Sequence, residues 1–295
     1  GSDHPQGPLV LVDADLGWWK TPSTFIDFQR RIQDALALDP ARLIFALTHT
    51  HAGPPLMQPD ESLPGSQLLQ AWMSDLVETT ISTIRQACQN LFPATLDWHT
   101  GQCSLATQRD LPSPEQRDPN ATPASYLCGY NPAGNPDHTL VVGRITDSLG
   151  THRGTLVNYA CHPTTLAADN TAVSPDYIGA MRQTIEQTTS APAVFLLGMC
   201  GDLAPRYQYV GDTSVADRHG RQLGFAALAT LEGMEPANTA LEYQGVLESG
   251  APLAVWQHCP RVGSTQLRAL RKTLTLPLKD WPTASELEKQ RLACS

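Results

Sequence analysis

Leu43-Ile-Phe-Ala-Leu-Thr-His-Thr-His-Ala-Gly-Pro54 is the segment that decides the fold of this chain. Its apolar first half has the length of a buried strand, and Gly53 followed by proline ends that strand. In an extended backbone, residues i and i+2 point to the same side, so His49 and His51 should project together from the carboxyl end of the strand. Open α/β sheets bind ligands at this edge, and paired imidazoles suit a divalent metal, zinc above all. Taken alone, the segment is equally compatible with two hydrogen-bonded histidines that bind no metal.

The residues before this strand predict a βαβ unit. Residues 8–15 are mostly apolar and indicate a buried strand. A helix capped by Ser23 or Thr24 is expected over about 24–38, because phenylalanine, isoleucine and leucine recur there at helical spacing. Strand, helix and strand joined by short links give two parallel strands.

The alternation of helices and strands continues along the chain. Further elements are expected as a helix at 66–90, an extended segment at 94–106, a hairpin at 140–160, a helix at 175–187, a strand at 193–197 and a helix at 214–231. We therefore expect residues 1–295 to form one α/β domain with a mixed, largely parallel sheet flanked by helices. Its site should lie at the carboxyl ends of the strands.

Composition and charge exclude several kinds of partner. The 295 residues are 41% hydrophobic and 17% charged, as in ordinary globular proteins. A net charge of -9 would repel a phosphate backbone, so no nucleic-acid partner is expected. No apolar stretch approaches the ~18 residues of a membrane span, and the first residues lack the pattern of a signal peptide. Seven scattered cysteines indicate neither a disulfide scaffold nor a cysteine zinc site; Cys200 is read as a buried thiol, with a nucleophilic role as the weaker alternative.

Two more strands end in residues that suit a site. His162 follows the strand expected at 154–160, and Gly201-Asp202 follows the one at 193–197. Small residues such as Gly201 let the backbone approach a ligand closely. Three strand ends with polar groups indicate a functional site rather than a chance arrangement.

These strand ends supply a set of metal ligands. His49, His51 and His162 could form a three-histidine zinc site with an open water position. Asp176 and Asp202 are the carboxylates available to orient a ligand or to act as a base.

Residues 107–136 change character, with many prolines and little periodicity. A structureless insert of this length is usually functional or disordered, and we expect it to form a wall of the site. Tyr126 and Tyr130 indicate that it packs on other residues, and Arg109 lies near its start.

Four motifs occur in order along the chain: Thr48-His-Thr-His-Ala-Gly-Pro54, Asn158-Tyr-Ala-Cys-His-Pro-Thr164, Ser174-Pro-Asp-Tyr-Ile-Gly179 and Gly201-Asp-Leu-Ala-Pro205. Together they resemble the amino-terminal catalytic domain of the neutral/alkaline (non-lysosomal) ceramidase family. Thr107-Gln-Arg-Asp110 resembles that family's Asn-Arg-Asp/Arg segment, with Gln108 in place of the asparagine. The resemblance extends over roughly residues 8–290 and implies a zinc-dependent amidase.

The resemblance also implies roles for single residues. His49 and His162 match the two histidine ligands of the zinc ion. His51 matches a histidine beside the metal that assists at the scissile amide, and Arg109 matches an arginine that lines the pocket. We therefore take His51, Arg109 and Asp202 as the candidate catalytic residues.

Two departures from the family pattern affect these expectations. Ala204 stands where the family has serine or asparagine, so no hydroxyl or amide acts there. The family's two further zinc ligands are a glutamate in a Pro-Gly-Glu segment and a tyrosine in a Gly-Tyr segment, and no Pro-Gly-Glu occurs in this sequence. We expect these ligands beyond Ser295, and hence a domain that is incomplete at both ends.

The function expected from these observations is zinc-dependent hydrolysis of the N-acyl amide bond of ceramide-like lipids by metal-activated water. The partner is then a lipid-like amide, with access from a membrane surface. One alternative is an inactive or incomplete ceramidase-like binding domain. Another is a metal-dependent esterase or deacetylase that acts on a polar substrate, which would not need an apolar groove.

Overall fold

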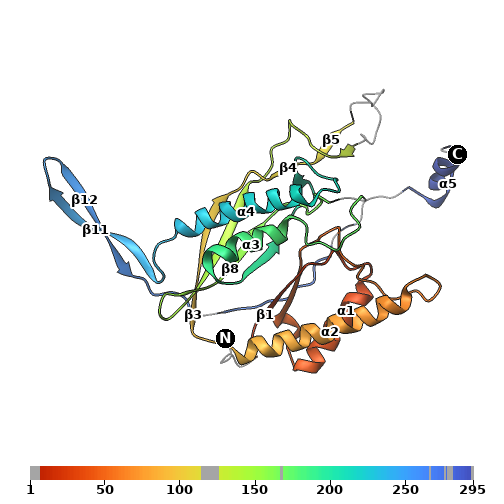
Figure 1. The fold of residues 1–295 in the computed structure, drawn as a ribbon, viewed down its shortest axis with the longest axis horizontal. Helices are drawn as coiled ribbons and strands as arrows, with labels where there is room; N and C mark the ends of the chain where they lie inside the picture. Colours follow the sequence, from red (N-terminus) through yellow and green to blue (C-terminus); the bar gives the residue numbers. More distant parts are fainter. Residues whose placement is uncertain are drawn as a thin grey trace.

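The computed structural model describes residues 7–113, 126–166, 169–265, 267–275, 277 and 282–293. This part of the chain has a mixed α/β architecture (Figure 1). β1 (Val10–Ala14) and β2 (Leu43–Leu47) form a parallel pair, with Val10 opposite Leu43 and Ala14 opposite Leu47. The mixed α/β class and the parallel βαβ unit expected from the sequence are confirmed.

The larger sheet has the strand order β3-β7-β8-β9. Its strands are β3 (Ala94–Gln102), β7 (Thr139–Asp147), β8 (His152–Tyr159) and β9 (Ala193–Leu197). β8 and β9 are parallel, but β3 pairs antiparallel with β7, and β7 pairs antiparallel with β8. This sheet is therefore less parallel than expected. The turn between β7 and β8 is too short for the crossover that a parallel pair needs.

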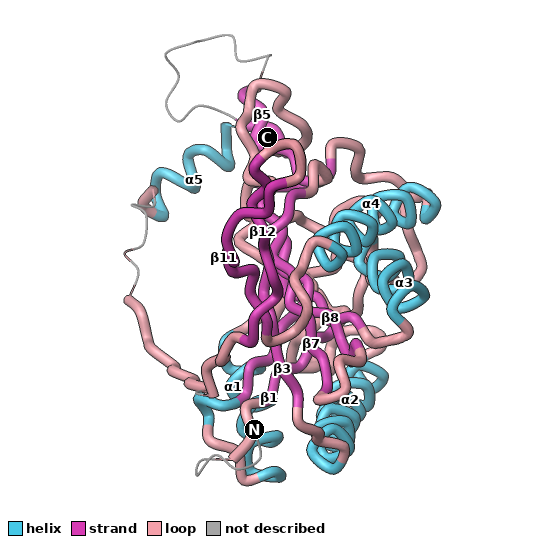
Figure 2. Tube along the Cα trace, turned by 90° about the vertical axis from the view of Figure 1, so that its left-hand side faces the viewer, coloured by secondary structure: helices cyan, strands magenta, loops and turns pink. Residues whose placement is uncertain are grey.

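Helices cover the β1–β2 pair and the larger sheet. The helical segments are α1 (Pro22–Leu36), η1 (Pro40–Arg42), α2 (Ser66–Gln89), α3 (Tyr177–Thr189), α4 (Thr213–Glu232) and α5 (Ala284–Ala293). α1 and α2 bury their apolar faces with β1 and β2, around Phe28, Ile32 and Ile81. α3 and α4 lie side by side on the larger sheet, where Met181 and Leu223 join its core (Figure 2). No helix in the described part of the chain is both long enough and apolar enough to cross a membrane.

The start of α1 differs from the expected cap. The helix begins at Pro22, and the Thr21 hydroxyl accepts a hydrogen bond from the Thr24 backbone N–H at 3.3 Å. Capping by Ser23 or Thr24 is therefore wrong. Proline suits the first helical position because its missing N–H would have no partner there, so the helix starts earlier.

Three further strand pairs complete the fold: β4 (Ala106–Gln108) with β10 (Leu203–Pro205), β5 (Asp110–Pro112) with β6 (Tyr126–Cys128), and the longer β11 (Thr239–Glu248) with β12 (Pro252–Pro260). The β11–β12 hairpin projects from the rest of the molecule (Figure 1). Parts of the segment 107–136 thus form strands where the sequence predicted an insert without regular structure. Residues 114–125 of that segment lie outside the described residues.

Candidate metal centre

His49 follows the end of β2 and has a left-handed backbone. Its φ is 67°, a conformation that a non-glycine residue adopts at a cost of about 1–3 kcal/mol. The strand has ended at Leu47, so strand alternation does not explain why His49 and His51 lie together. Instead, the His49 N–H donates to the Leu16 carbonyl at 2.9 Å, and this bond holds the turn against the end of β1.

The following residue fixes the other side of this turn. The Thr50 hydroxyl donates to the Ser174 carbonyl at 2.7 Å, and the Ser174 N–H donates to the Ala52 carbonyl at 3.0 Å. The turn after β2 is thereby tied both to β1 and to the segment before α3.

The rings of His49, His51 and His162 converge. The ring of His49 lies 5.3 Å from that of His51 and 4.8 Å from that of His162, and the rings of His51 and His162 are 5.6 Å apart, centre to centre. Each residue offers one ring nitrogen, and these nitrogens lie within 4.8 Å of one another. Zinc–nitrogen bonds of about 2.0–2.1 Å hold two ligand atoms at most about 4 Å apart, so a small inward movement of the rings would suffice for a shared ion.

Two of the three rings are oriented by backbone groups. His162 Nδ1 lies 2.7 Å from the Cys200 carbonyl oxygen, which can only accept, so Nδ1 carries the hydrogen and Nε2 keeps its lone pair. His49 forms a hydrogen bond with the backbone of Gly17. Histidines that bind metals usually donate their second ring N–H in this way. Among the described residues, none forms a hydrogen bond with the ring of His51, which distinguishes it from the other two.

Burial keeps the three imidazoles neutral. Desolvation lowers the pKa of His51 and of His162 to about 4, and it also lowers the pKa of His49. The positive charge of Arg109 adds to the effect on each of them. Neutral imidazoles at pH 7 are the form that binds a metal or accepts a proton.

Arg109 lies between β4 and β5 and is held by its backbone. Its N–H donates to the Asp202 carbonyl at 2.8 Å, and its own carbonyl accepts from the Gly129 N–H at 2.8 Å. The Nε of Arg109 is buried and has no hydrogen-bond partner among the described residues. The charge of Arg109 thus acts on all three histidines, and its Nε is a buried donor without a partner among the described residues.

The two carboxylates predicted for the site have other partners. The exposed Asp202 carboxylate accepts a hydrogen bond from Gln108 Nε2 at 2.9 Å. Asp176 is buried at the start of α3, where its carboxylate accepts from the Leu166 N–H at 2.9 Å and from the Tyr177 N–H at 2.6 Å. Burial raises the pKa of Asp176. Its oxygens are committed to backbone donors, so it anchors the chain after His162 and is poorly placed to act as a base.

Cys200 contributes its backbone carbonyl to the site, as the hydrogen-bond partner of His162, and not its thiol. Burial raises the pKa of this thiol to about 11, which keeps it protonated at neutral pH. A thiol in that state is a weak nucleophile. The structure therefore disfavours the nucleophilic alternative.

Trp18 is a further residue of the site, one that was not predicted from the sequence. Its ring lies 5.2 Å from that of His49 and 4.9 Å from that of His51, centre to centre, and Lys20 Nζ lies 4.2 Å from the centre of the same indole. Trp18 follows β1, which is parallel to β2, so its place at the same sheet edge was a signal available in the sequence.

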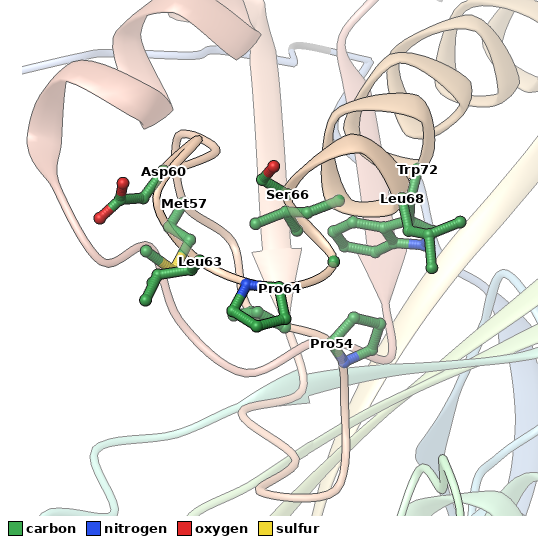
Figure 3. Close-up of a pocket in the computed structure, with 11 residues that line it drawn as sticks. Pro54, Met57, Asp60, Leu63, Pro64, Ser66, Leu68 and Trp72 are labelled. Atoms are coloured by element: carbon green, nitrogen blue, oxygen red, sulfur yellow. The ribbon is translucent and has the colours of Figure 1, made fainter.

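An apolar cavity of about 430 Å³ is lined by residues that begin at Pro54, shortly after His51 in the sequence (Figure 3). It lies between the proline-rich loop that follows His51 and the first turns of α2. Figure 3 shows Pro54, Leu63, Pro64, Leu68 and Trp72 around it. Cavities of this size and character accommodate apolar parts of small ligands.

Comparisons with known proteins agree with this description. Residues 27–207 match the family model described as "Neutral/alkaline non-lysosomal ceramidase, N-terminal". A solved structure described as "Ceramidase complexed with C2" is 20% identical and has a TM-score of 0.58; the match covers 76% of this chain and 36% of that one. The neutral ceramidase from Pseudomonas aeruginosa is 17% identical with a TM-score of 0.59, over 83% of this chain and 42% of that one. This chain thus spans about two fifths of the length of either structure, and these likenesses concern the fold. No curated protein matches it.

Proposed function

We propose that this chain, which belongs to the neutral/alkaline non-lysosomal ceramidase family, is a zinc-dependent amide hydrolase that cleaves the N-acyl bond of ceramide-like lipids. One observation supports this above all. Three neutral imidazoles from two separate strand ends converge, and backbone groups orient two of them as in metal sites.

The donor set fits zinc. His49 and His162 are the proposed ligands, because the hydrogen bonds of their rings leave one nitrogen of each ring for a metal. Zinc held there would lower the pKa of a bound water to about 7 and polarise an amide carbonyl.

The remaining residues act on the substrate. His51 is neutral and makes no hydrogen bond with the described residues, so its ring can accept a proton from water and pass it to the leaving amine. Arg109 carries a permanent charge, and its free Nε donor suits the oxyanion that forms on the amide. Asp202 is proposed as a positioning residue, since its carbonyl holds the backbone of Arg109.

The apolar cavity supports a lipid-like substrate over a polar one. Its lining is mainly proline, leucine, methionine and tryptophan, which would bind an alkyl chain and offer few partners to a sugar or peptide. An esterase or deacetylase for polar substrates is therefore the weaker candidate. Hydrolysis of a long-chain N-acyl sphingosine should exceed that of its two-carbon analogue, and the reverse order would favour the polar substrate.

The metal proposal is tested by zinc titration of the protein and of three variants. His49→Ala and His162→Ala should each lower zinc affinity at least a hundredfold. His99→Ala, which changes an exposed histidine on β3, should bind as the parent does. A chelator should also abolish amide hydrolysis, and zinc should restore it.

Two outcomes would count against the proposal. Unchanged zinc affinity in both site variants would show that the ion binds elsewhere. Tight zinc binding at this site without hydrolysis would favour the alternative, a non-catalytic binding domain.

A further inference from the structure

His51 lacks the hydrogen bond that orients the other two rings of the cluster. The ring of His162 bonds to the Cys200 carbonyl and that of His49 to the backbone of Gly17, whereas no described residue bonds to the ring of His51. His51 is also the most exposed of the three. A partly exposed side chain without a hydrogen bond can change rotamer freely, so another contact must hold this ring if it is to transfer a proton.

The indole of Trp18 offers the ring of His51 a packing surface. Their centres lie 4.9 Å apart, and the two ring planes are inclined by 50°. Inclined rings at such distances are a favourable arrangement of aromatic side chains. The rings of His49 and His162 lie farther from that of His51, at 5.3 and 5.6 Å. Trp18 is 39% exposed, so burial in the core does not account for its position.

The backbone on both sides of Trp18 is held in place. On one side, the Leu16 carbonyl accepts a hydrogen bond from the His49 N–H at 2.9 Å. On the other side, the Lys20 N–H donates to the Leu56 carbonyl at 2.9 Å. Trp18 is thus fixed both to the turn that carries the histidines and to the loop that follows it.

Two further contacts restrict the indole. A Cβ on Gly17 would lie 3.0 Å from the Thr50 carbonyl oxygen, so the segment that carries Trp18 lies directly against the histidine turn. Lys20 Nζ lies 4.2 Å from the centre of the indole, within the range of a cation–π interaction. The indole is therefore a fixed surface, whereas His51 is a side chain that needs one.

We propose that Trp18 is a positioning residue, which orients His51 by ring packing where backbone hydrogen bonds orient His49 and His162. The catalytic consequence rests on the proposed function, in which His51 transfers a proton. The packing itself involves only the side chains of this chain and requires neither zinc nor a substrate.

A different role for Trp18 would be direct contact with the substrate. The two roles differ in their kinetics. Loss of a contact made equally in the bound substrate and in the transition state raises KM, whereas loss of an orientation needed only for the reaction lowers kcat.

NMR on the metal-free protein tests the packing directly. Three-bond couplings across χ1 report whether a histidine side chain occupies one rotamer or averages over several. In the parent protein, His51 and His162 should each occupy one rotamer. In Trp18→Ala the couplings of His51 should average, while those of His162 stay unchanged because its bond to the Cys200 carbonyl remains.

Two variants serve as controls for this measurement. Trp18→Phe keeps an aromatic ring at the position and should preserve the single rotamer of His51. Trp256→Ala removes an exposed tryptophan from the β11–β12 hairpin and should alter neither histidine.

Kinetics and zinc titration test the consequence. Trp18→Ala should lower kcat for amide hydrolysis about 10- to 100-fold, because small misplacements of a reacting group are costly. Its KM should stay within about twofold of the parent value, and Trp18→Phe should recover most of the lost kcat. Zinc affinity should stay within about threefold, because the hydrogen bonds that orient His49 and His162 remain.

Three results would overturn the proposal: a single His51 rotamer in Trp18→Ala, averaging of His162 to the same extent as His51, or a raised KM with unchanged kcat. The last would make Trp18 a substrate contact. A parent protein that hydrolyses no amide would count against the proposed function alone, and the couplings would still decide the role of Trp18.

Discussion

Arg109 adds to the effect of burial on the electrostatics of the histidine cluster. Its positive charge opposes protonation of His49, His51 and His162, and each of these groups has a lowered pKa partly for this reason. The guanidinium thus favours the neutral imidazoles that a metal requires, even before any part that it plays with a substrate.

Replacing this charge should be visible in the metal-free protein. In Arg109→Gln the pKa of His162 and of His51 should rise from about 4 towards the ordinary value, and Arg109→Lys should keep both low because the charge remains. NMR titration of the imidazole signals measures this. Amide hydrolysis by Arg109→Gln should also fall about 10²–10³-fold, as for other lost oxyanion donors. Unshifted histidine signals in Arg109→Gln would place the guanidinium away from the cluster.

At the scale of elements, α3 and α4 cross at small residues. A Cβ on Gly220 of α4 would overlap the Tyr177 carbonyl oxygen and lie 2.7 Å from the Ala180 Cβ. These helices also carry residues that hold the chain after His162. Asp176 caps α3, and Nδ1 of His219 in α4 shares a hydrogen bond of 3.1 Å with the Thr165 hydroxyl. Close helix packing and the position of His162 are therefore coupled.

Gly220→Ala should lower the free energy of unfolding by more than about 2 kcal/mol, in the range of overpacked cores. Helix propensity alone predicts a gain of about 1 kcal/mol for the same change. Gly233→Ala is the control, because a Cβ there meets no heavy atom closer than 3.5 Å. Urea denaturation measures both variants, and equal stability of the two would mean that the helices do not cross as closely as described.

At the scale of the whole molecule, buried histidines couple stability to pH. His162 and His219 are 7% and 8% exposed, and burial lowers the pKa of each to about 4. The unfolded chain, with a histidine pKa of about 6.5, binds more protons between these values. The contribution of these two histidines to the free energy of unfolding is thus fully present above pH 6.5, and it is lost as the pH falls towards 4.

In the metal-free protein, each of these histidines should lower the free energy of unfolding by at most about 3 kcal/mol as the pH falls from 6.5 to 4. The pKa values of Asp13 and Asp176 are raised, so these two carboxyls favour the folded protein as the pH falls towards their ordinary pKa. The measured dependence of the unfolding free energy on pH is therefore the histidine effect minus the carboxyl effect. His219→Asn isolates one group, and its unfolding free energy should depend less on pH than that of the parent. Denaturation curves at pH 6.5, 5.5 and 4.5 measure this, and identical slopes for parent and variant would contradict it.

The sequence by itself determined most of the longer helices and strands, although not the cap of α1 or the short strands in segment 107–136. The apolar run at 43–47 and the helical spacing before it predicted a parallel βαβ unit, and the structure has one. The family and the mixed α/β class were also predicted correctly. These features depend on side chains a few residues apart, so the spacing of apolar residues along the sequence is enough to predict them. The zinc ion and the catalytic roles of His51 and Arg109 stay predictions, and the predicted catalytic role of Asp202 is replaced by a proposed positioning role.

Only the tertiary structure decided how distant segments meet. It brought His162 beside the turn that follows β2, and it placed Trp18 against both histidines of that turn. It also decided the left-handed backbone of His49 and the antiparallel pairs of the larger sheet. Each of these depends on packing between segments far apart in the chain, and no local period records which partner a residue will have.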